Sequence, residues 1–162
     1  MDSSQLLRQI MQSKNRRGSF PIGDFFLEDA AEMAVRRARE CGIAQMTAKQ
    51  CFDNALAMTI HHPQFGRYVY CEGYWLHHSN MWAPIDHAWV YDTYEDKYID
   101  PTIPHDERGT YIGIKIPLTV LLQCHAGSRW KGNVIDTLWR GYPMTREEIT
   151  RTRSLLEEIN ES

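Results

Sequence analysis

The spacing of hydrophobic residues changes twice along the chain, from helical to strand-like and back to helical. From about Asp24 to Glu40 apolar residues recur every three or four positions, which predicts a helix that Gly42 ends. A shorter amphipathic pattern over residues 5–14 predicts a separate N-terminal helix. We therefore predict an N-terminal arm over residues 1–23 and a single domain over residues 24–162.

Another helix is predicted to begin at Thr47. Thr47 and Gln50 have the spacing of a capping box, in which two side chains satisfy each other's backbone amides. The residue before a proline disfavours helical geometry, so the helix should end near His61, just before Pro63. This interpretation places Cys51 in the first turn of the helix.

The middle of the chain is rich in Tyr, Trp, Val and Ile and predicts at least four short strands in succession. They lie at about 67–76, 85–91, 98–100 and 110–116. Turn residues at 93–96 join the second strand to the third, which predicts an antiparallel hairpin. If Asp92 faces Lys97 across this hairpin, His87 and Asp100 become diagonal neighbours on one face of the sheet.

Helical spacing returns in the last third of the chain, at about 118–124, 133–139 and 145–158. The whole pattern predicts an α+β domain. In it, the helix that carries Cys51 packs on an antiparallel sheet of four to six strands, with further helices flanking it on the N- and C-terminal sides.

Composition narrows the function classes. The 162 residues carry a net charge of −3 with scattered basic residues, and 43% are hydrophobic, which argues for a globular core and against a nucleic-acid partner. Neither an apolar stretch of about 20 residues nor a secretory signal is present in the sequence. The four cysteines lack the spacing of a zinc site or a disulfide framework. We expect a cytoplasmic protein without a cofactor, a metal or a membrane partner, and the oligomeric state stays open.

Three residues in three predicted elements suggest nucleophilic catalysis. Cys51 lies at a helix N-terminus, where unpaired amides and the positive end of the helix dipole stabilise a thiolate. His87 lies on the next but one element and would serve as the base, and Asp100, on the following strand, would orient its imidazole. An alternative is a metal site, if Cys51, Cys71 and His87 converge.

The order Cys, His, Asp on a helix and two strands resembles the papain-like cysteine enzymes in the broad sense. The resemblance covers about residues 45–115 and is strongest to the transglutaminase-like branch and its arylamine N-acetyltransferase relatives. Small, mostly uncharacterised bacterial and phage proteins are similar in their local motifs. In this sequence these motifs are KQCFDNA at 49–55, YCEGY at 70–74, PIDHAW at 84–89, DPT at 100–102 and YIG at 111–113. The resemblance implies that Cys51, His87 and Asp100 are catalytic, and it names no substrate.

Several further residues are candidates for supporting roles. In papain a Gln six residues before the nucleophile helps to hold the oxyanion, and Gln45 stands at that offset here, with Gln50 as a competitor. Asn54 would brace the loop before the helix. The candidate substrate contacts are Glu72, Trp75, Trp82 and Trp89. The chain departs from the family at Phe52, where a Trp often follows the nucleophile.

These observations predict a cysteine-dependent acyl-transfer enzyme with a protein or peptide substrate. Water as the acceptor would give a hydrolase of the peptidase or deamidase type. An amine as the acceptor would give a transglutaminase or N-acyltransferase. The alternative is a phage-type inhibitor that keeps the scaffold without catalysis and binds a protein partner through the loop at 75–82 and the N-terminal arm.

Overall fold

Strands rich in Tyr, Trp, Val and Ile form the centre of the structure, because such side chains pack well on both faces of a pleated sheet. A computed structural model describes Gln5 and residues 31–79, 84–126 and 132–135. Apart from Gln5, the predicted N-terminal arm lies outside these residues. So do the predicted helix at 145–158 and all of the helix at 133–139 except its first residues, of which Val134 and Ile135 are helical.

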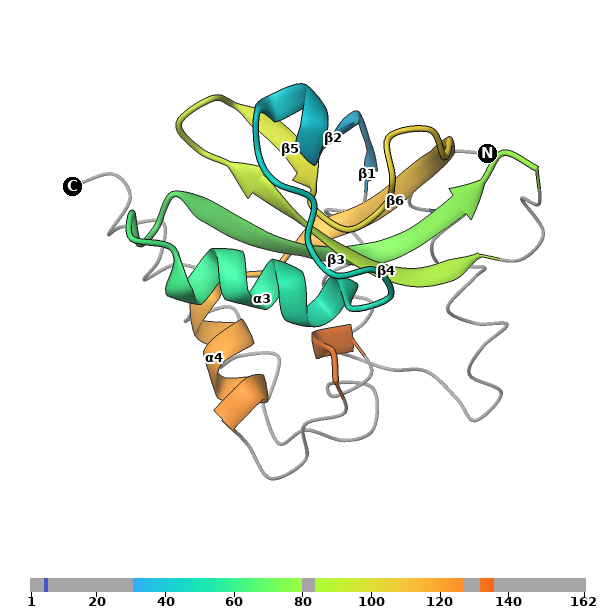
Figure 1. Cartoon of the computed structure of the whole chain (residues 1–162). Coiled ribbons are helices and arrows are strands. Elements are labelled where there is room, and N and C mark those ends of the chain that lie inside the picture. Colours follow the sequence, from blue (N-terminus) through green and yellow to red (C-terminus); the bar gives the residue numbers. More distant parts are fainter. Residues whose placement is uncertain (1–4, 6–30, 80–83, 127–131, 136–162) are drawn as a thin grey trace.

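The described residues form six strands, two α-helices and a short 3-10 helix (Figure 1). In chain order these are β1 (Ala31–Met33), β2 (Val35–Arg37), η1 (Ala38–Cys41), α3 (Cys51–His61), β3 (Tyr68–His77), β4 (Ile85–Asp92), β5 (Lys97–Asp100), β6 (Gly109–Lys115) and α4 (Leu118–Ala126). The strands at β3 to β6 and the helix ends at His61 and Ala126 agree closely with the sequence-based expectations.

All six strands belong to one sheet, in the order β1-β6-β3-β4-β5-β2. Most neighbouring strands are antiparallel, but β2 runs parallel to β5. The expected α+β class is therefore confirmed, whereas the expected purely antiparallel sheet is wrong. The sheet is mixed because β2, which precedes the central strands in the sequence, lies at the outer edge and runs parallel to its neighbour β5.

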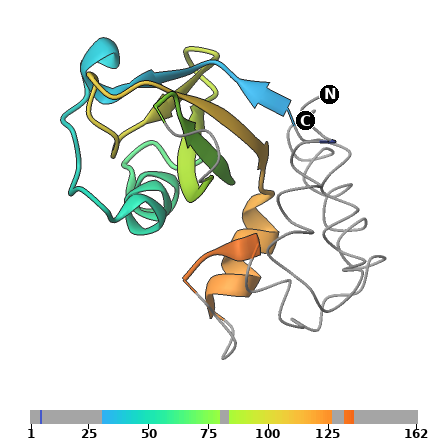
Figure 2. The ribbon, with the colours of Figure 1, turned by 90° about the vertical axis from the view of Figure 1, so that its right-hand side faces the viewer.

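The sheet is curled into a half-barrel. Strands β1 and β2 occupy opposite edges of the sheet, yet only Ala34 separates them in the sequence. Consecutive Cα atoms are about 3.8 Å apart, so the two edges must approach each other closely at Ala34. The blue ribbon of these strands accordingly closes the top of the curl in Figures 1 and 2.

The helix predicted over residues 24–40 is wrong for its described part, because residues 31–37 form the two edge strands. Met33 and Arg37 are buried, and Val35 between them is half-buried. A spacing of four residues fits one turn of a helix and also two full alternations of a strand. The pattern was therefore ambiguous, and pairing with β6 and β5 decides for strand.

Helices α3 and α4 pack on the outer face of the curled sheet, below it in Figure 1. The core between them is built from every second residue of the strands together with the buried side of each helix. Its buried members include Ala55, Met58, Tyr70, Tyr74, Val90, Ile99, Ile112, Ile114, Val120 and Leu121. None of the helices in the described part of the chain is long and apolar enough to cross a membrane.

The inner, concave face carries a second, more aromatic core. Its buried hydrophobic residues are Met33, Cys71, Trp75, Trp89 and Tyr111. The indole of Trp89 on β4 contacts the sulfur of Met33 on β1, with Nε1 and Sδ 3.3 Å apart. Because β1 and β4 are not neighbours in the sheet, this contact crosses the inside of the curl and holds it closed.

Two glycines allow this inner packing. Gly73 on β3 pairs with Gly113 on β6 and with His87 on β4. A Cβ atom at Gly73 would lie 2.1 Å from the backbone oxygen of Ile112, and one at Gly113 would lie 2.6 Å from the ring of Trp89. The missing side chains let the central strands and the indole approach closely beside His87.

We predict that Gly73→Ala lowers the free energy of unfolding by roughly 3 kcal/mol or more, because the clash is with backbone and cannot be relieved by a rotamer change. Urea denaturation followed by tryptophan fluorescence measures it. Gly66→Ala is the matched control, since its Cβ would meet nothing within 4 Å and its φ of 89° costs only about 1–2 kcal/mol. Equal losses in the two variants would contradict the close approach at Gly73.

Candidate active site

Helix α3 begins later than the sequence predicted. Its first residue is Cys51, Gln50 is the N-cap residue, and the side chain of Gln50 makes no capping hydrogen bond. The predicted capping box with Thr47 is therefore wrong. The helix starts late because Lys49 has a left-handed φ of 63°, which interrupts helical geometry before Cys51.

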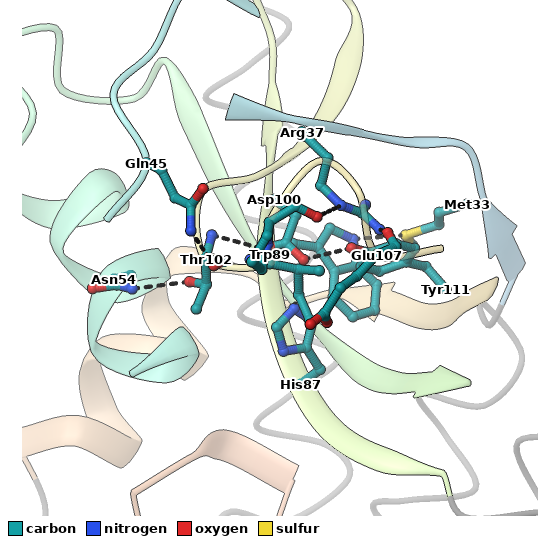
Figure 3. Close-up of polar contacts among 12 residues, drawn as sticks. Met33, Arg37, Gln45, Asn54, His87, Trp89, Asp100, Thr102, Glu107 and Tyr111 are labelled. Atoms are coloured by element: carbon teal, nitrogen blue, oxygen red, sulfur yellow. Dashed lines mark hydrogen bonds and ion pairs between the residues drawn. The ribbon is translucent and has the colours of Figure 1, made fainter. Parts of the chain in front are cut away.

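Hydrogen bonds hold the segment before α3 against the end of β5. The buried amide of Asn54 makes two of them, donating to the backbone oxygen of Thr47 at 2.8 Å and to Oγ1 of Thr102 at 2.9 Å. The amide of Gln45 donates to the backbone oxygen of Thr102 at 3.3 Å, and the backbone amide of Met46 donates to that of Pro101 at 2.8 Å. The expected bracing by Asn54 is thus present (Figure 3).

These bonds bring the N-terminus of α3 to His87, although α3 lies on the outer face and His87 on the inner face. Strand β5 pairs with β4 only at Val90 to Asp92, so it leaves the β4 edge at His87 uncovered. Helix α3 packs against β4. Cys51, its first residue, is buried, and its thiol lies close enough to His87 to influence the imidazole.

The predicted hairpin register is confirmed, since Asp92 pairs with Lys97 and Tyr91 with Tyr98. As that register requires, His87 and Asp100 meet, with Nε2 and Oδ2 2.6 Å apart (Figure 3). Asp100 engages Nε2, which leaves Nδ1 as the ring nitrogen that a neighbouring thiol could use. The imidazole of His87 therefore has the carboxylate on one nitrogen and Cys51 nearby.

Asp100 is fully buried, and each oxygen of its carboxylate has two donors. Oδ1 accepts from the backbone amides of Thr102 at 2.8 Å and Ile103 at 3.2 Å. Oδ2 accepts from His87 and from the hydroxyl of Tyr111 at 2.5 Å. A carboxylate held in this way cannot rotate without breaking hydrogen bonds on both sides.

The charges of this pair follow from the contacts. Burial is the largest influence on His87 and lowers its pKa, but the hydrogen bonds and charges of Asp100 and Cys51 outweigh it and raise the pKa to about 9. Burial likewise acts to raise the pKa of Asp100, but the hydrogen bonds from His87, Tyr111 and Thr102 outweigh it and lower this pKa. At neutral pH the pair is therefore imidazolium and carboxylate.

Aromatic rings enclose the imidazole on the inner face. Trp89 stacks beside it with ring centroids 6.0 Å apart and planes 28° apart. The rings of Trp75 and Tyr111 lie at 6.4 and 5.9 Å. This surrounding excludes water from His87 and favours a cation through the faces of the rings.

The predicted substrate contacts fall mostly in the interior. Trp89 and Trp75 are 0% and 4% exposed and contact His87 instead, and Trp82 lies outside the described residues. Glu72 is also buried, on the outer face, and accepts from Tyr70 and from the backbone amides of Val134 and Ile135. In this conformation Glu72, Trp75 and Trp89 pack inside the protein and present no surface to solvent.

A small cleft adjoins the start of α3 on the outer face. Its volume is about 10 Å³, and its lining includes Phe52, which follows Cys51, and Gly73, which pairs with His87. The remaining lining residues are Glu72, Tyr74, Asp86, Asn133 and Ile135. A cleft of about 10 Å³ has room for about one water molecule and not for a side chain.

Three cysteines, Cys41, Cys71 and Cys124, have surroundings that disfavour the thiolate. Burial raises the pKa of Cys41, of Cys71 and of Cys124, the last to about 12. The described residues contain no group of three or more His, Cys, Asp and Glu side chains that could hold a metal ion. Cys71 instead donates to the backbone oxygen of Val69.

Sequence reasoning missed two residues beside the His87–Asp100 pair, Tyr111 and Arg37. Tyr111 lies on β6 in register with Trp75, and only the long-range pairing of β3 with β6 puts its hydroxyl on Asp100. Arg37, in the segment predicted to be helical, is buried with its guanidinium 5.1 Å from the centre of the Tyr111 ring. The YIG motif at 111–113 was the available signal for Tyr111.

Comparisons with protein-family models, with curated proteins and with solved structures find no match for this chain. The geometry of the site therefore has to carry the functional argument.

We predict that the protein loses stability between about pH 6.5 and 9. The pKa of His87 is raised by folding from 6.5 to about 9, so its contribution is complete below 6.5 and disappears as pH rises through 9. The loss should reach about 3 kcal/mol at most, measured by urea denaturation at a series of pH values. For Asp100, whose pKa is lowered, stability is lost instead as pH falls below the ordinary carboxyl range.

His87→Gln is the control for this prediction, because it removes the titrating group and should flatten the profile between pH 6.5 and 9. An unchanged slope in His87→Gln would assign the pH dependence to another group.

Proposed function

We propose that this protein is a cysteine-dependent acyl-transfer enzyme with Cys51 as nucleophile, His87 as acid and base, and Asp100 as the residue that orients the imidazole. The observation that carries the proposal is the grouping of Cys51, His87 and Asp100, in which Asp100 binds Nε2 of the imidazole and the buried thiol of Cys51 lies close enough to influence the same ring. Nucleophile, base and orienting group are the parts that covalent acyl transfer needs.

The first step is attack of the Cys51 thiolate on the carbonyl carbon of an amide or thioester. The imidazolium of His87 then gives its proton to the leaving amine or thiol as the carbonyl-to-leaving-group bond breaks, which leaves an acyl-enzyme and neutral imidazole. Asp100 holds the proton on Nε2, so that Nδ1 faces the reacting atoms.

The developing oxyanion would be held by backbone amides in the first turn of α3, since the first four amides of a helix have no acceptor within it. Of the two glutamine candidates, Gln50 is the better placed. It is exposed and immediately precedes Cys51, whereas the amide of Gln45 is committed to the backbone of Thr102.

In the second step neutral His87 removes a proton from the acceptor, which attacks the acyl-enzyme and releases Cys51. Water gives hydrolysis, of the peptidase or deamidase type, and a primary amine gives the transglutaminase or N-acyltransferase outcome.

We also propose that the curled sheet and α3 represent the papain-like or transglutaminase-like arrangement. The supporting feature is the order of the parts: a helix that starts with Cys, then a strand with His and a strand with Asp. The non-catalytic inhibitor remains the alternative outcome of the experiments below, because a scaffold of this kind can persist without reactivity.

We predict that p-nitrophenyl acetate, an activated acyl donor, forms an acyl-enzyme at Cys51 that intact-mass spectrometry detects. Cys51→Ala should abolish the adduct without unfolding, because alanine suits a first helical turn and removes only a small side chain. Adding a primary amine during turnover distinguishes the acceptors, since an amide product appears only if amine competes with water.

Cys41→Ala is the matched control, because Cys41 is the one half-buried thiol among the four cysteines and its replacement leaves Cys51 in place. It should leave the adduct unchanged. An acyl adduct that persists in Cys51→Ala, or its absence from the folded wild-type protein, would exclude Cys51 as the nucleophile and favour the binding protein.

We predict that Asp100→Asn slows alkylation of Cys51 by iodoacetamide at pH 7 by about 100-fold or more while the fold persists. The backbone amides of Thr102 and Ile103 would keep the asparagine oxygen in the place of Oδ1. Its NH₂ group would then face Nε2 of His87, so the imidazole proton would move to Nδ1. A protonated Nδ1 cannot accept the proton of the thiol.

Asp92→Asn is the matched control for this variant. Asp92 is another buried carboxylate near the same hairpin, bound to Arg67. Its replacement should lower stability and leave the alkylation rate unchanged. Wild-type alkylation in Asp100→Asn would show that His87 does not need the carboxylate.

A further inference from the structure

The hydrogen-bonded chain does not end at Asp100. The hydroxyl of Tyr111 donates to Oδ2 of Asp100, the same oxygen that accepts from His87. The guanidinium of Arg37 lies over the ring of Tyr111, with Cζ 5.1 Å from the ring centroid. A cation at this place polarises the phenol and strengthens its hydroxyl as a donor to Asp100.

Arg37 is held in this place by the chain around it. Its guanidinium donates to the backbone oxygens of Glu107 at 2.8 Å and Pro104 at 3.4 Å (Figure 3). Arg37 comes from β2 and Tyr111 from β6, strands that are not neighbours in the sheet. The contact therefore crosses the inside of the curl, and it exists only because the two edges approach each other.

We infer that Tyr111, supported by Arg37, is a positioning residue that shares the charge of Asp100 and so limits how tightly the carboxylate holds the proton of His87. Two donors on one oxygen compete for the same negative charge. A phenol polarised by a guanidinium is the stronger competitor. The hydrogen bonds to Asp100 do not depend on any reaction at Cys51. Only the effect of Tyr111 on proton transfer by His87 rests on the proposed function.

That consequence concerns the proton that His87 must give away. An imidazolium held too tightly by its carboxylate is a poor acid toward a leaving amine, and it stays charged when the second step needs a base. Sharing the charge of Asp100 with Tyr111 moves the imidazole toward the range in which it can both release and accept a proton.

The groups that bear on the charge of His87 come from four elements in the described part of the chain. They are Cys51 on α3, Asp100 on β5, Tyr111 on β6 and, one step further, Arg37 on β2. With Cys51 as thiolate the set holds two cations and two anions. Removing the neutral phenol hydroxyl leaves all four of these charges in place.

The test is the titration of His87 by NMR in protein labelled with ¹⁵N-histidine, with its signal assigned by loss in His87→Gln. In Tyr111→Phe the titration midpoint of His87 should move upward by roughly half a pH unit or more, because Asp100 then binds the imidazolium alone. Replacing Tyr111 with 3-fluorotyrosine strengthens the donor and should move the midpoint downward. Tyr98→Phe, on the same inner face beside Tyr91, is the control and should cause no change.

A merely structural hydroxyl predicts the opposite sign. If Tyr111 only holds Asp100 in place, Tyr111→Phe loosens the carboxylate and the midpoint of His87 moves down toward that of a free imidazole. Either this result or an unchanged midpoint in both Tyr111 variants overturns the inference. The 3-fluorotyrosine protein decides the question even if Tyr111→Phe does not fold. Because the readout needs no turnover, an unreactive Cys51 would reject the proposed function and leave this test intact.

Discussion

A carboxylate without any contact to water is the constraint on which this site depends. Burying the charge of Asp100 would cost several kcal/mol if its oxygens were unpaired, so the surrounding chain must supply donors in fixed positions. The donors come from β4, from β6 and from the bend that follows β5. Thr102, which supplies one of them, also accepts the amide of Asn54, so the start of α3 is set by the same bend.

The curl of the sheet is the second condition. A flat sheet of the same strand order would place β2 and β6 at a distance of several strands, and Arg37 could not reach Tyr111. Only one residue, Ala34, joins the two edge strands, which forces the sheet to bend until they meet. Gly73 and Gly113 then leave room for the indole of Trp89 inside the bend. The packing that closes the half-barrel therefore also encloses His87.

Local signals in the sequence were enough for the hairpin of β4 and β5, because the turn at 93–96 is short and sets the register on its own. That register alone places His87 beside Asp100. Two other features depended on distant pairing and were not predictable. The Met33 and Arg37 pattern fits a helix and a strand equally, and the position of Tyr111 depends on β6 pairing with β3 across an intervening hairpin. The start of α3 was misplaced because nothing in the residue types shows that Lys49 takes a left-handed conformation.

The site lies at the β4 edge, where the inner and outer faces of the sheet meet. It can therefore combine a water-free environment for His87 and Asp100 with a cysteine that comes from the outer face. His87 and Asp100 belong to the inner face, where aromatic rings exclude water and make their hydrogen bonds strong. Cys51 reaches them from a helix on the outer face, through the part of the β4 edge that β5 leaves uncovered. The cleft beside Phe52 opens on that outer side. Under the proposed acyl transfer, a substrate would approach Cys51 from the outer side while His87 and Asp100 stay in the dry interior. The early end of β5 is what would let the buried pair act on such a substrate.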